Sequence, residues 1–355
     1  MSLELRAAAL RVGADTHIHP TDLVCEPGSF NILLGTTLAG KTTLMKLMAG
    51  LEKPTSGEVW FGGQNVTGVS VRRRNVSMVY QQFINYPNMT VFENIASPLR
   101  VARMAEAEIK RRVGTMADLL KLTPMLERRP AELSGGQQQR TALARALVKD
   151  ADLVLLDEPL ANLDFKLREE LRDELPRLFA DRECIVVYAT TEPVEALLFG
   201  GFTACLHEGR VTQFGPTGET YRAPVDLVSA QVFSDPPINV ATVTKTGAEF
   251  RLGQMVGWHT EGPLAGLPDG TYTVGVRPHH VSPEETGGQP VPVDGKVLVT
   301  ELSGSESVIH FTMRGETWVS QSHGIHPFPV GSEQRLYADM SQALFFDAAG
   351  RRITA

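Results

Sequence analysis

The loop from Gly35 to Thr42, which reads GTTLAGKT, constrains this chain more than any other stretch. It follows the apolar run FNILLG and precedes TTLMKLMAGL, whose apolar residues recur with helical periodicity. A strand, a loop of the form GxxxxGK[ST] and a helix predict an α/β fold that binds phosphate through backbone N–H groups. Lys41 is expected to reach the β and γ phosphates, and the Thr42 hydroxyl is expected to bind Mg²⁺. The residues expected to bind nucleotide here are Gly35, Thr36, Thr37, Leu38, Ala39, Gly40, Lys41, Thr42 and Thr43.

A pair of acidic residues complements this loop. The run LVLLDEP at 153–159 predicts a buried strand that ends in Asp157 and Glu158. Asp157 is expected to hold the metal, and Glu158 to polarise the attacking water. Two acids after a strand are by themselves usually only a solvated strand end, but the loop at 35–42 favours the catalytic interpretation.

A third motif identifies a family. LSGGQ at 133–137 precedes QQRTALARALV, which predicts a helix that begins after Ser134 and exposes N–H groups at its start. Together with the two motifs above, LSGGQQQR resembles the signature of ABC-type ATPases. The fold class this resemblance implies is an α/β P-loop NTPase that binds ATP with Mg²⁺.

The resemblance also implies how nucleotide sites are shared. ABC ATPases work as head-to-tail dimers, so the loop at 35–42 of one subunit would meet Ser134, Gly135, Gly136 and Gln137 of the other around ATP. Gln81, in MVYQQ, matches the glutamine that joins metal and water to the transporter contact. Asn162, Leu163 and Asp164, in LANLD, match the loop that crosses the dimer interface.

Similarity over nearly the whole chain narrows the class to ATP-binding subunits of bacterial sugar and polyol importers. The matching stretches are INYPNMTVFENI, GRVTQFGPTGETYRAP, FSDPPIN and GVRPHHV. The resemblance implies that 84–95 docks on the membrane subunits, with a periplasmic solute-binding protein acting indirectly; a plain surface loop and helix is the alternative for this segment. It places the protein on the cytoplasmic face of the bacterial inner membrane, as a peripheral subunit.

Composition indicates a second domain. After the proline break SDPPINV, short strand-like runs alternate with glycine-rich turns. We predict an ABC ATPase domain over 1–235 and a β-rich, OB-like (TOBE-type) regulatory domain over 236–355. Between 104 and 127 and between 165 and 180 we expect helices, the second kinked or interrupted near Pro176.

The stretch YATTEP at 188–193 departs from the family pattern. The family has a histidine that contacts the γ-phosphate at the position of Thr191. A hydroxyl donates one hydrogen bond but cannot carry positive charge or shuttle protons as imidazole does. Hydrolysis at this subunit's own phosphate loop is therefore expected to be impaired.

A second departure concerns adenine. Val12 occupies the position where the family usually has an aromatic residue that stacks on the base. Its aliphatic side chain loses that stacking, and His17 or His19 is a possible substitute. Since LSGGQ is intact, both departures suit a heterodimer with a second ATP-binding subunit, which we favour over a homodimer in which Thr191 is a harmless variant.

Charge and cysteine usage limit the other function classes. The net charge of −7 gives no global basic field, so nucleic acid is not an expected partner. Three cysteines without CxxC spacing argue against zinc and against a disulfide framework. A soluble ABC ATPase not coupled to transport and an ATP-binding regulatory subunit with little turnover stay open as alternatives. For an importer, the expected cargo is glycerol first, then glycerol 3-phosphate or a sugar.

Overall fold

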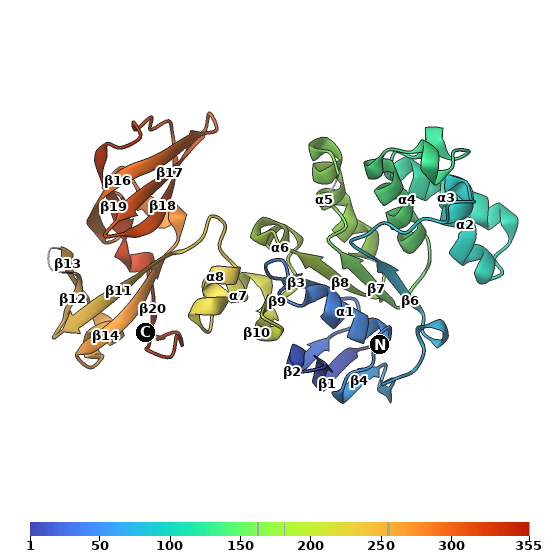
Figure 1. The fold of residues 1–355 in the computed structure, drawn as a ribbon, viewed down its shortest axis with the longest axis horizontal. Helices are drawn as coiled ribbons and strands as arrows, with labels where there is room; N and C mark the ends of the chain where they lie inside the picture. The colour runs from blue at the N-terminus through green and yellow to red at the C-terminus, as the bar shows by residue number, and fades with distance from the viewer. Residues whose placement is uncertain (162, 181, 254–255, 355) are drawn as a thin grey trace. The chain divides into compact units, whose positions relative to one another are not determined.

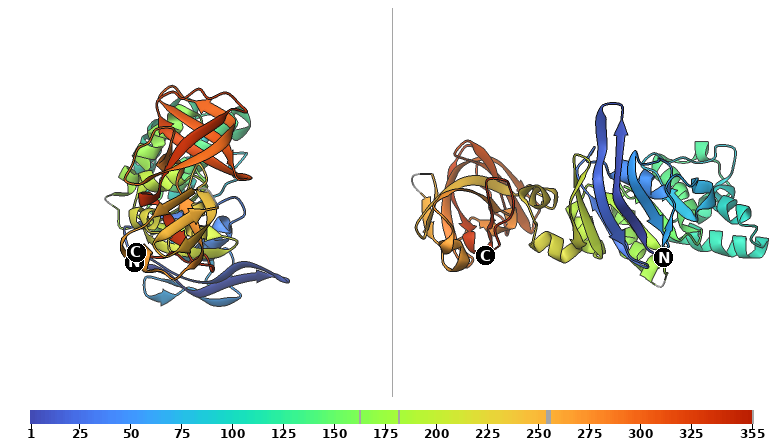
Figure 2. Two further views of the ribbon diagram at one scale, coloured as in Figure 1. Left: turned by 90° about the vertical axis from the view of Figure 1, so that its left-hand side faces the viewer. Right: turned by 90° about the horizontal axis from the view of Figure 1, so that it is seen from below.

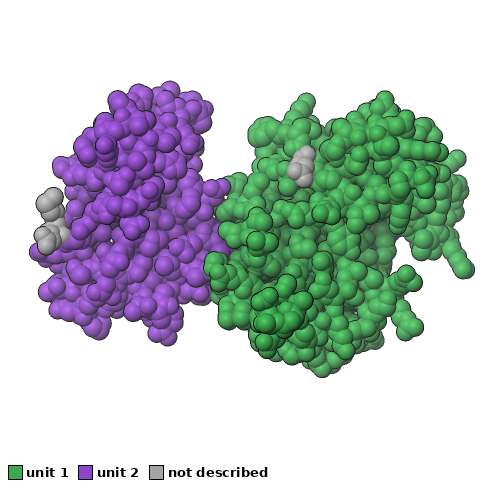
Figure 3. Space-filling model, viewed as in Figure 1, with its two compact units in different colours: residues 1–220 green, residues 221–355 purple. Residues whose placement is uncertain are grey.

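A computed structural model describes residues 1–161, 163–180, 182–253 and 256–354. The chain forms two compact units, residues 1–220 and 221–355 (Figure 3). Each unit has its own buried apolar core, so each is described by itself.

A six-stranded sheet forms the centre of the first unit, in the order β10-β9-β3-β8-β7-β6 (Figure 1). All neighbouring strands are parallel except β10, which pairs antiparallel with β9. β7 and β8 are buried along their entire length, which explains their unbroken apolar sequences. The strands are β3 (Phe30–Leu34), β6 (Val76–Val79), β7 (Leu153–Asp157), β8 (Ile185–Thr190), β9 (Phe202–His207) and β10 (Arg210–Pro216).

A second, antiparallel sheet has the order β2-β1-β4-β5. Its apolar side chains share one core with α1 (Lys41–Ala49) and with the central sheet, so α1 is enclosed on both sides. Figure 2 shows β1 and β2 as one long hairpin beside the rest of the unit. The strands are β1 (Leu3–Val12), β2 (Asp15–Cys25), β4 (Ser56–Phe61) and β5 (Gln64–Asn65).

The other helices of the first unit lie in two groups (Figure 1). α2 (Val91–Val101), α3 (Glu106–Leu119) and α4 (Gly135–Leu147) pack on one another. The helix expected over 104–127 is shorter in the structure, where it covers only Glu106–Leu119 and is followed by a 3₁₀ turn at Thr123–Met125. α5 (Phe165–Ala180) packs against α6 (Pro193–Phe199) and has the predicted bounds, but it runs through Pro176 without the expected interruption.

The second unit is β-rich, which confirms the predicted OB-like (TOBE-type) domain. Its sheets have the orders β13-β12-β11-β14-β20 and β15-β19-β16-β17-β18, and their inner faces share one core. The first sheet contains β11 (Asn239–Thr246), β12 (Glu249–Leu252), β13 (Val256–His259), β14 (Gly270–Val276) and β20 (Leu344–Phe346). The second contains β15 (Val281–Ser282), β16 (Pro290–Leu302), β17 (Glu306–Met313), β18 (Glu316–His323) and β19 (Glu333–Asp339).

The two compact units divide at 220/221, whereas sequence composition predicts a domain boundary at 235/236. α7 (Thr217–Arg222) contains the division at 220/221, and α8 (Leu227–Val232) belongs to the second unit. The reason is a set of contacts that sequence composition does not reveal. The Arg277 guanidinium, buried in the second unit, donates to the carbonyl oxygens of Tyr221 and Phe233, and Leu227 N donates to Gly350 O at 2.9 Å.

Candidate functional site

The loop at 35–40 joins β3 to α1 at the carboxyl end of the central sheet. Gly35 leaves no room for a side chain, because a Cβ there would lie 2.5 Å from Leu206 O. Gly40, immediately before α1, has φ +104°, a conformation that glycine adopts without strain. The N–H groups of the first turn of α1 therefore open toward the loop and can bind an anion.

The loop lines a cavity of about 480 Å³. Thr37, Leu38, Gly40, Lys41, Thr42 and Thr43 contribute to its wall, together with Gln81 and Glu158. Among the other loop residues, Ala39 is buried, and its N–H donates to Thr36 O at 3.1 Å. The structure thus brings most of the predicted phosphate-loop residues around one opening.

Three polar side chains converge beside this loop. The Lys41 ammonium is 5% exposed; it donates to the carbonyl oxygens of Gly35 at 2.8 Å and Thr36 at 3.1 Å. It also lies 3.2 Å from Glu158 Oε1, while Gln81 Nε2 donates to Glu158 Oε2 at 3.2 Å. Both oxygens of Glu158 are therefore held in place, as expected for a carboxylate that orients water.

The backbone at Glu158 is unusual. Its φ of +47° places a non-glycine residue in the left-handed region. Glu158 N donates to Ala189 O at 3.1 Å, so the turn is tied to the end of β8. Such strain persists only where surrounding contacts enforce it and clusters at functional sites.

Thr42 and Asp157 have the chemistry that Mg²⁺ requires. Thr42 Oγ1 donates to Asp157 Oδ2 at 2.7 Å, and Asp157 is 1% exposed. Asp157 Oδ1 is buried and has no hydrogen-bond partner among the described residues. Burial raises the pKa of Asp157 above its ordinary value against the opposing effect of the Thr42 hydrogen bond.

A cation would satisfy this carboxylate. Mg²⁺ usually binds one or two protein oxygens and completes its shell with water and phosphate. Asp157 and Thr42 would hold the ion, with Gln81 reaching it from the side of Glu158. The bound ion neutralises charge on the phosphates, while Lys41 supplies the fixed positive charge of the protein.

The residue predicted to contact adenine does not line the cavity, whereas other residues of the same hairpin do. Val12 ends β1, is 55% exposed and is not among the cavity-lining residues. Asp15, Thr16 and His17, at the start of β2, line the cavity instead. His17 was one of the two substitutes that the sequence suggested for the missing aromatic residue.

Thr191 follows the last residue of β8. Its side chain is exposed, and it makes no hydrogen bond within the described part of the chain. The preceding residue, Thr190, accepts the N–H of Gly35 at 3.3 Å through its carbonyl. Thr191 thus follows directly a residue that is hydrogen-bonded to the start of the phosphate loop, although Thr191 itself does not line the cavity.

Two further cavity residues, Glu208 and Gly209, were not predicted. They form the turn between β9 and β10, and Gly209 N donates to Ala39 O at 2.9 Å. On the other side, a Cβ at Gly209 would lie 2.3 Å from His17 O. No local pattern marks this turn, because its role comes from residues remote in the sequence.

The signature residues begin α4, away from the cavity wall. Ser134 Oγ accepts the N–H of Gln137 at 3.3 Å, and Gln137 Oε1 accepts the N–H of Ser134 at 2.9 Å. This reciprocal capping box fixes Gly135 and Gly136 in the first turn. Asp164 caps α5 by accepting Leu167 N at 3.0 Å, and Asn162 of the same predicted loop lies outside the described residues.

The fold and this site define a P-loop ATPase. A family model described as "ABC transporter" matches residues 18–161. The sn-glycerol-3-phosphate import ATP-binding protein of Yersinia pestis bv. Antiqua (strain Antiqua) is 35% identical over 345 residues, 96% of each chain. The protein of that name from Cupriavidus necator is 36% identical over 349 residues, 95% of each chain. This chain belongs to the family of ABC transporter ATP-binding proteins, and its activity is ATP hydrolysis coupled to import.

Solved structures agree with the fold of the first unit. A dimeric ATP-binding cassette bound to ADP and phosphate superposes with a TM-score of 0.56 at 28% identity, covering 61% of this chain and 98% of the other. An ATP-binding subunit of an ABC transporter superposes with a TM-score of 0.57 at 24% identity over 62% and 92% of the two chains. No helix in the described ranges is long and apolar enough to span a membrane.

Proposed function

We propose that this chain energises import of a glycerol-class solute, with sn-glycerol 3-phosphate as the first candidate. The observation that carries this proposal is the match to sn-glycerol-3-phosphate import proteins along 96% of the chain, including the β-rich unit. The sequence alone ranked glycerol first among the candidate cargoes, and the names of these relatives place sn-glycerol 3-phosphate before it. Glycerol is the second candidate, supported by the departures at Val12 and Thr191.

The docking surface on the membrane subunits is the segment 84–95. Ile84 and Tyr86 are more than one-third exposed, although large apolar side chains are usually buried. Asn94, fully buried at the start of α2, accepts Tyr86 N at 2.8 Å and donates to Tyr86 O at 3.1 Å. The Arg145 guanidinium lies 4.8 Å from the centroid of the Tyr86 ring. A rigid backbone that presents exposed apolar groups suits a partner helix, and this contact would hold the protein at the cytoplasmic face of the inner membrane.

The same proposal includes pairing with a second, different ATPase subunit. Thr191 weakens hydrolysis at this chain's own phosphate loop, whereas the capping box at Ser134 keeps the signature helix ready for the partner's nucleotide. In a heterodimer, most hydrolysis would occur at the site completed by Ser134. Purification of the tagged chain with its membrane subunits, followed by mass spectrometry, should yield a second ATPase. A complex that contains only this ATPase and transports at full rate would contradict the pairing.

The substrate proposal is tested by uptake in the organism that encodes the chain. Deletion of its coding sequence should abolish uptake of labelled sn-glycerol 3-phosphate, and the parent chain should restore it. Lys41→Ala, which removes the phosphate-binding ammonium, should not restore uptake. Loss of glycerol uptake alone would favour the second candidate, and unchanged uptake of both would contradict the proposal.

A further inference from the structure

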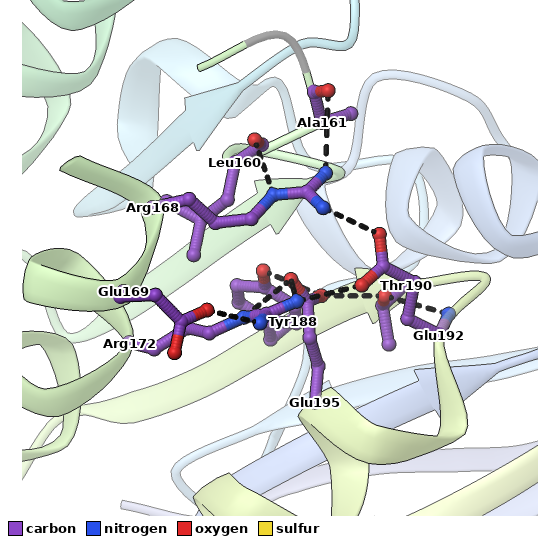
Figure 4. Close-up of polar contacts among 9 residues, drawn as sticks. All are labelled: Leu160, Ala161, Arg168, Glu169, Arg172, Tyr188, Thr190, Glu192 and Glu195. Atoms are coloured by element: carbon purple, nitrogen blue, oxygen red, sulfur yellow. Dashed lines mark hydrogen bonds and ion pairs between the residues drawn. The ribbon is translucent and has the colours of Figure 1, made fainter. Parts of the chain in front are cut away.

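A polar network links the loop after Glu158 to the segment around Thr191 (Figure 4). Its centre is Arg168, on the first turn of α5. Arg168 Nε donates to Leu160 O at 3.2 Å, and Nη2 donates to Ala161 O at 3.3 Å. Its third nitrogen, Nη1, lies 3.1 Å from Glu192 Oε1. Each nitrogen of the guanidinium therefore binds a different group, two of them before α5 and one after β8.

A second arginine, one turn further along α5, holds the other oxygen of Glu192. Arg172 Nη2 lies 2.6 Å from Glu192 Oε2, and Arg172 Nη1 lies 2.6 Å from Glu169 Oε1. The Arg172 side chain is only 11% exposed, so these pairs are screened less than surface ion pairs. Residues 168 and 172 share one face of the helix, and Glu192 bridges them.

The network continues to a buried carboxylate. Glu195 is 3% exposed and lies with Oε1 3.2 Å from Arg172 Nη2. Its Oε2 accepts the hydroxyls of Tyr188 at 2.9 Å and Thr190 at 2.6 Å. Burial raises the pKa of Tyr188 well above its ordinary value, so the phenol remains a donor. The buried charge is satisfied by three donors, as stable burial requires.

Both neighbours of Thr191 are anchored by these contacts. The Thr190 hydroxyl donates to Glu195 and accepts the N–H of Glu192 at 3.0 Å, while the Glu192 carboxylate is held by the two arginines. Thr191, whose own side chain is exposed, is thus positioned through its neighbours. At the other end of the network, Arg168 binds the carbonyls of Leu160 and Ala161, which belong to the loop that begins at Glu158.

We propose that Arg168 and Glu192 are positioning residues that make the 158–161 loop and the 190–192 segment move as one unit. Neither residue lines the cavity, so the network orders groups around Glu158 and Thr191 without binding nucleotide itself. The 190–192 segment lies between the phosphate loop and the 158–161 loop, because β8 lies between β3 and β7 in the sheet, Gly35 N donates to Thr190 O and Glu158 N donates to Ala189 O. A shift in one segment would therefore reach the other through Arg168.

Hydrogen exchange on the full-length chain tests this coupling. In Glu192→Ala, the amides of Ala161 and Leu163, which donate to Glu158 O and Leu160 O, should exchange at least about fivefold faster, a change typical of residues coupled in one network. Glu192 touches neither amide, so a role confined to its own segment would leave them unchanged. Arg177→Ala is the matched control, because Arg177 lies on the same helix, is 72% exposed and pairs only with Glu174 within the described residues. Unchanged exchange at 161–163 in Glu192→Ala overturns the proposal.

Kinetics provide the second readout. Arg168→Ala and Glu192→Ala should each lower kcat for ATP about tenfold, with the KM for ATP within about twofold, because binding through Lys41 is preserved. The double variant should lose no more than either single variant, because each substitution alone already breaks the Arg168–Glu192 pair that links the two segments. Multiplied losses, or a raised KM with unchanged kcat, overturn the proposal. If the alanine variants do not fold, Arg168→Lys replaces them: a compact ammonium lacks the planar fork whose three nitrogens reach Leu160 O, Ala161 O and Glu192 in different directions, so the same exchange increase is expected at Ala161 and Leu163, and normal protection would be contrary evidence.

Discussion

At the scale of single residues, the roles expected of Thr191 and Asp157 depend on opposite surroundings. Thr191 is exposed and positioned by its neighbours, whereas Asp157 is buried with one oxygen unpaired among the described residues. We therefore expect Thr191 to tolerate a larger side chain, and we expect a bound cation to relieve the cost of burying the Asp157 carboxylate.

Thr191→His should raise ATP turnover by the purified chain at least about tenfold, because imidazole adds the proton transfer and charge that a hydroxyl lacks. The exposed position leaves room for the ring. Steady-state phosphate release measures the gain, and adding Glu158→Gln should abolish it. If the parent already turns over at the rate of Thr191→His, threonine is no defect and a homodimer becomes the better interpretation.

Asp157→Asn should stabilise the nucleotide-free chain by roughly 1 kcal/mol, about 2–4 °C in Tm, and remove its stabilisation by Mg-ATP. The pKa of Asp157 is raised in the folded state, so its charged form opposes folding above that pKa. As pH falls through the folded pKa and then below the ordinary carboxyl value, this cost disappears. The advantage of the variant should therefore be full at neutral pH and lost in acid. Thermal melts across pH measure it, and an advantage that grows in acid would contradict the assignment.

At the scale of elements, two helices begin with the same device but serve different purposes. Ser134 caps α4, and Thr90 caps α2 by accepting Glu93 N at 3.2 Å. Ser134→Ala and Thr90→Ala should each cost about 1 kcal/mol of stability. Only Ser134→Ala should also lower ATP hydrolysis, because we expect its helix start to face the nucleotide of the partner subunit. Chemical unfolding measures the stability of both variants, and steady-state phosphate release measures their ATP turnover. Equal losses of turnover would mean that Ser134 acts only as a helix cap.

Element by element, local patterns predicted the parts whose causes are local. The apolar runs that became β3, β7 and β8 and the phosphate loop between Gly35 and Thr42 needed only neighbouring residues. By contrast, LELRAAALRV is rich in helix formers, yet Leu3–Val12 is a strand because β2 and β4 pair with it on both sides. The position of Gly209 at the cavity could not be predicted from local sequence either, because it depends on contacts with Ala39 and His17 far away in the chain.

At the scale of the whole molecule, the position of the division between the units can be measured. Tyr221 and Phe233 supply the carbonyl acceptors for the Arg277 guanidinium, which also lies 3.7 Å from the centroid of the Tyr221 ring. Arg277 is 6% exposed, and burial lowers its pKa. A fragment 221–355 keeps these partners, whereas a fragment 236–355 lacks both carbonyl acceptors and the ring that packs on the guanidinium.

The fragment 236–355 should therefore be less stable to urea than 221–355 by roughly 3 kcal/mol, as expected when one partner of a buried charge is removed. The variant Arg277→Met separates the loss of the Arg277 hydrogen bonds from the loss of buried surface that any truncation causes. The substitution should destabilise 221–355, where it leaves two carbonyls unpaired, and should change the stability of 236–355 much less, because both carbonyls are absent from that fragment. If the two fragments unfold at the same urea concentration, residues 221–235 do not belong energetically to the second unit, and the boundary predicted from composition at 235 is the better one.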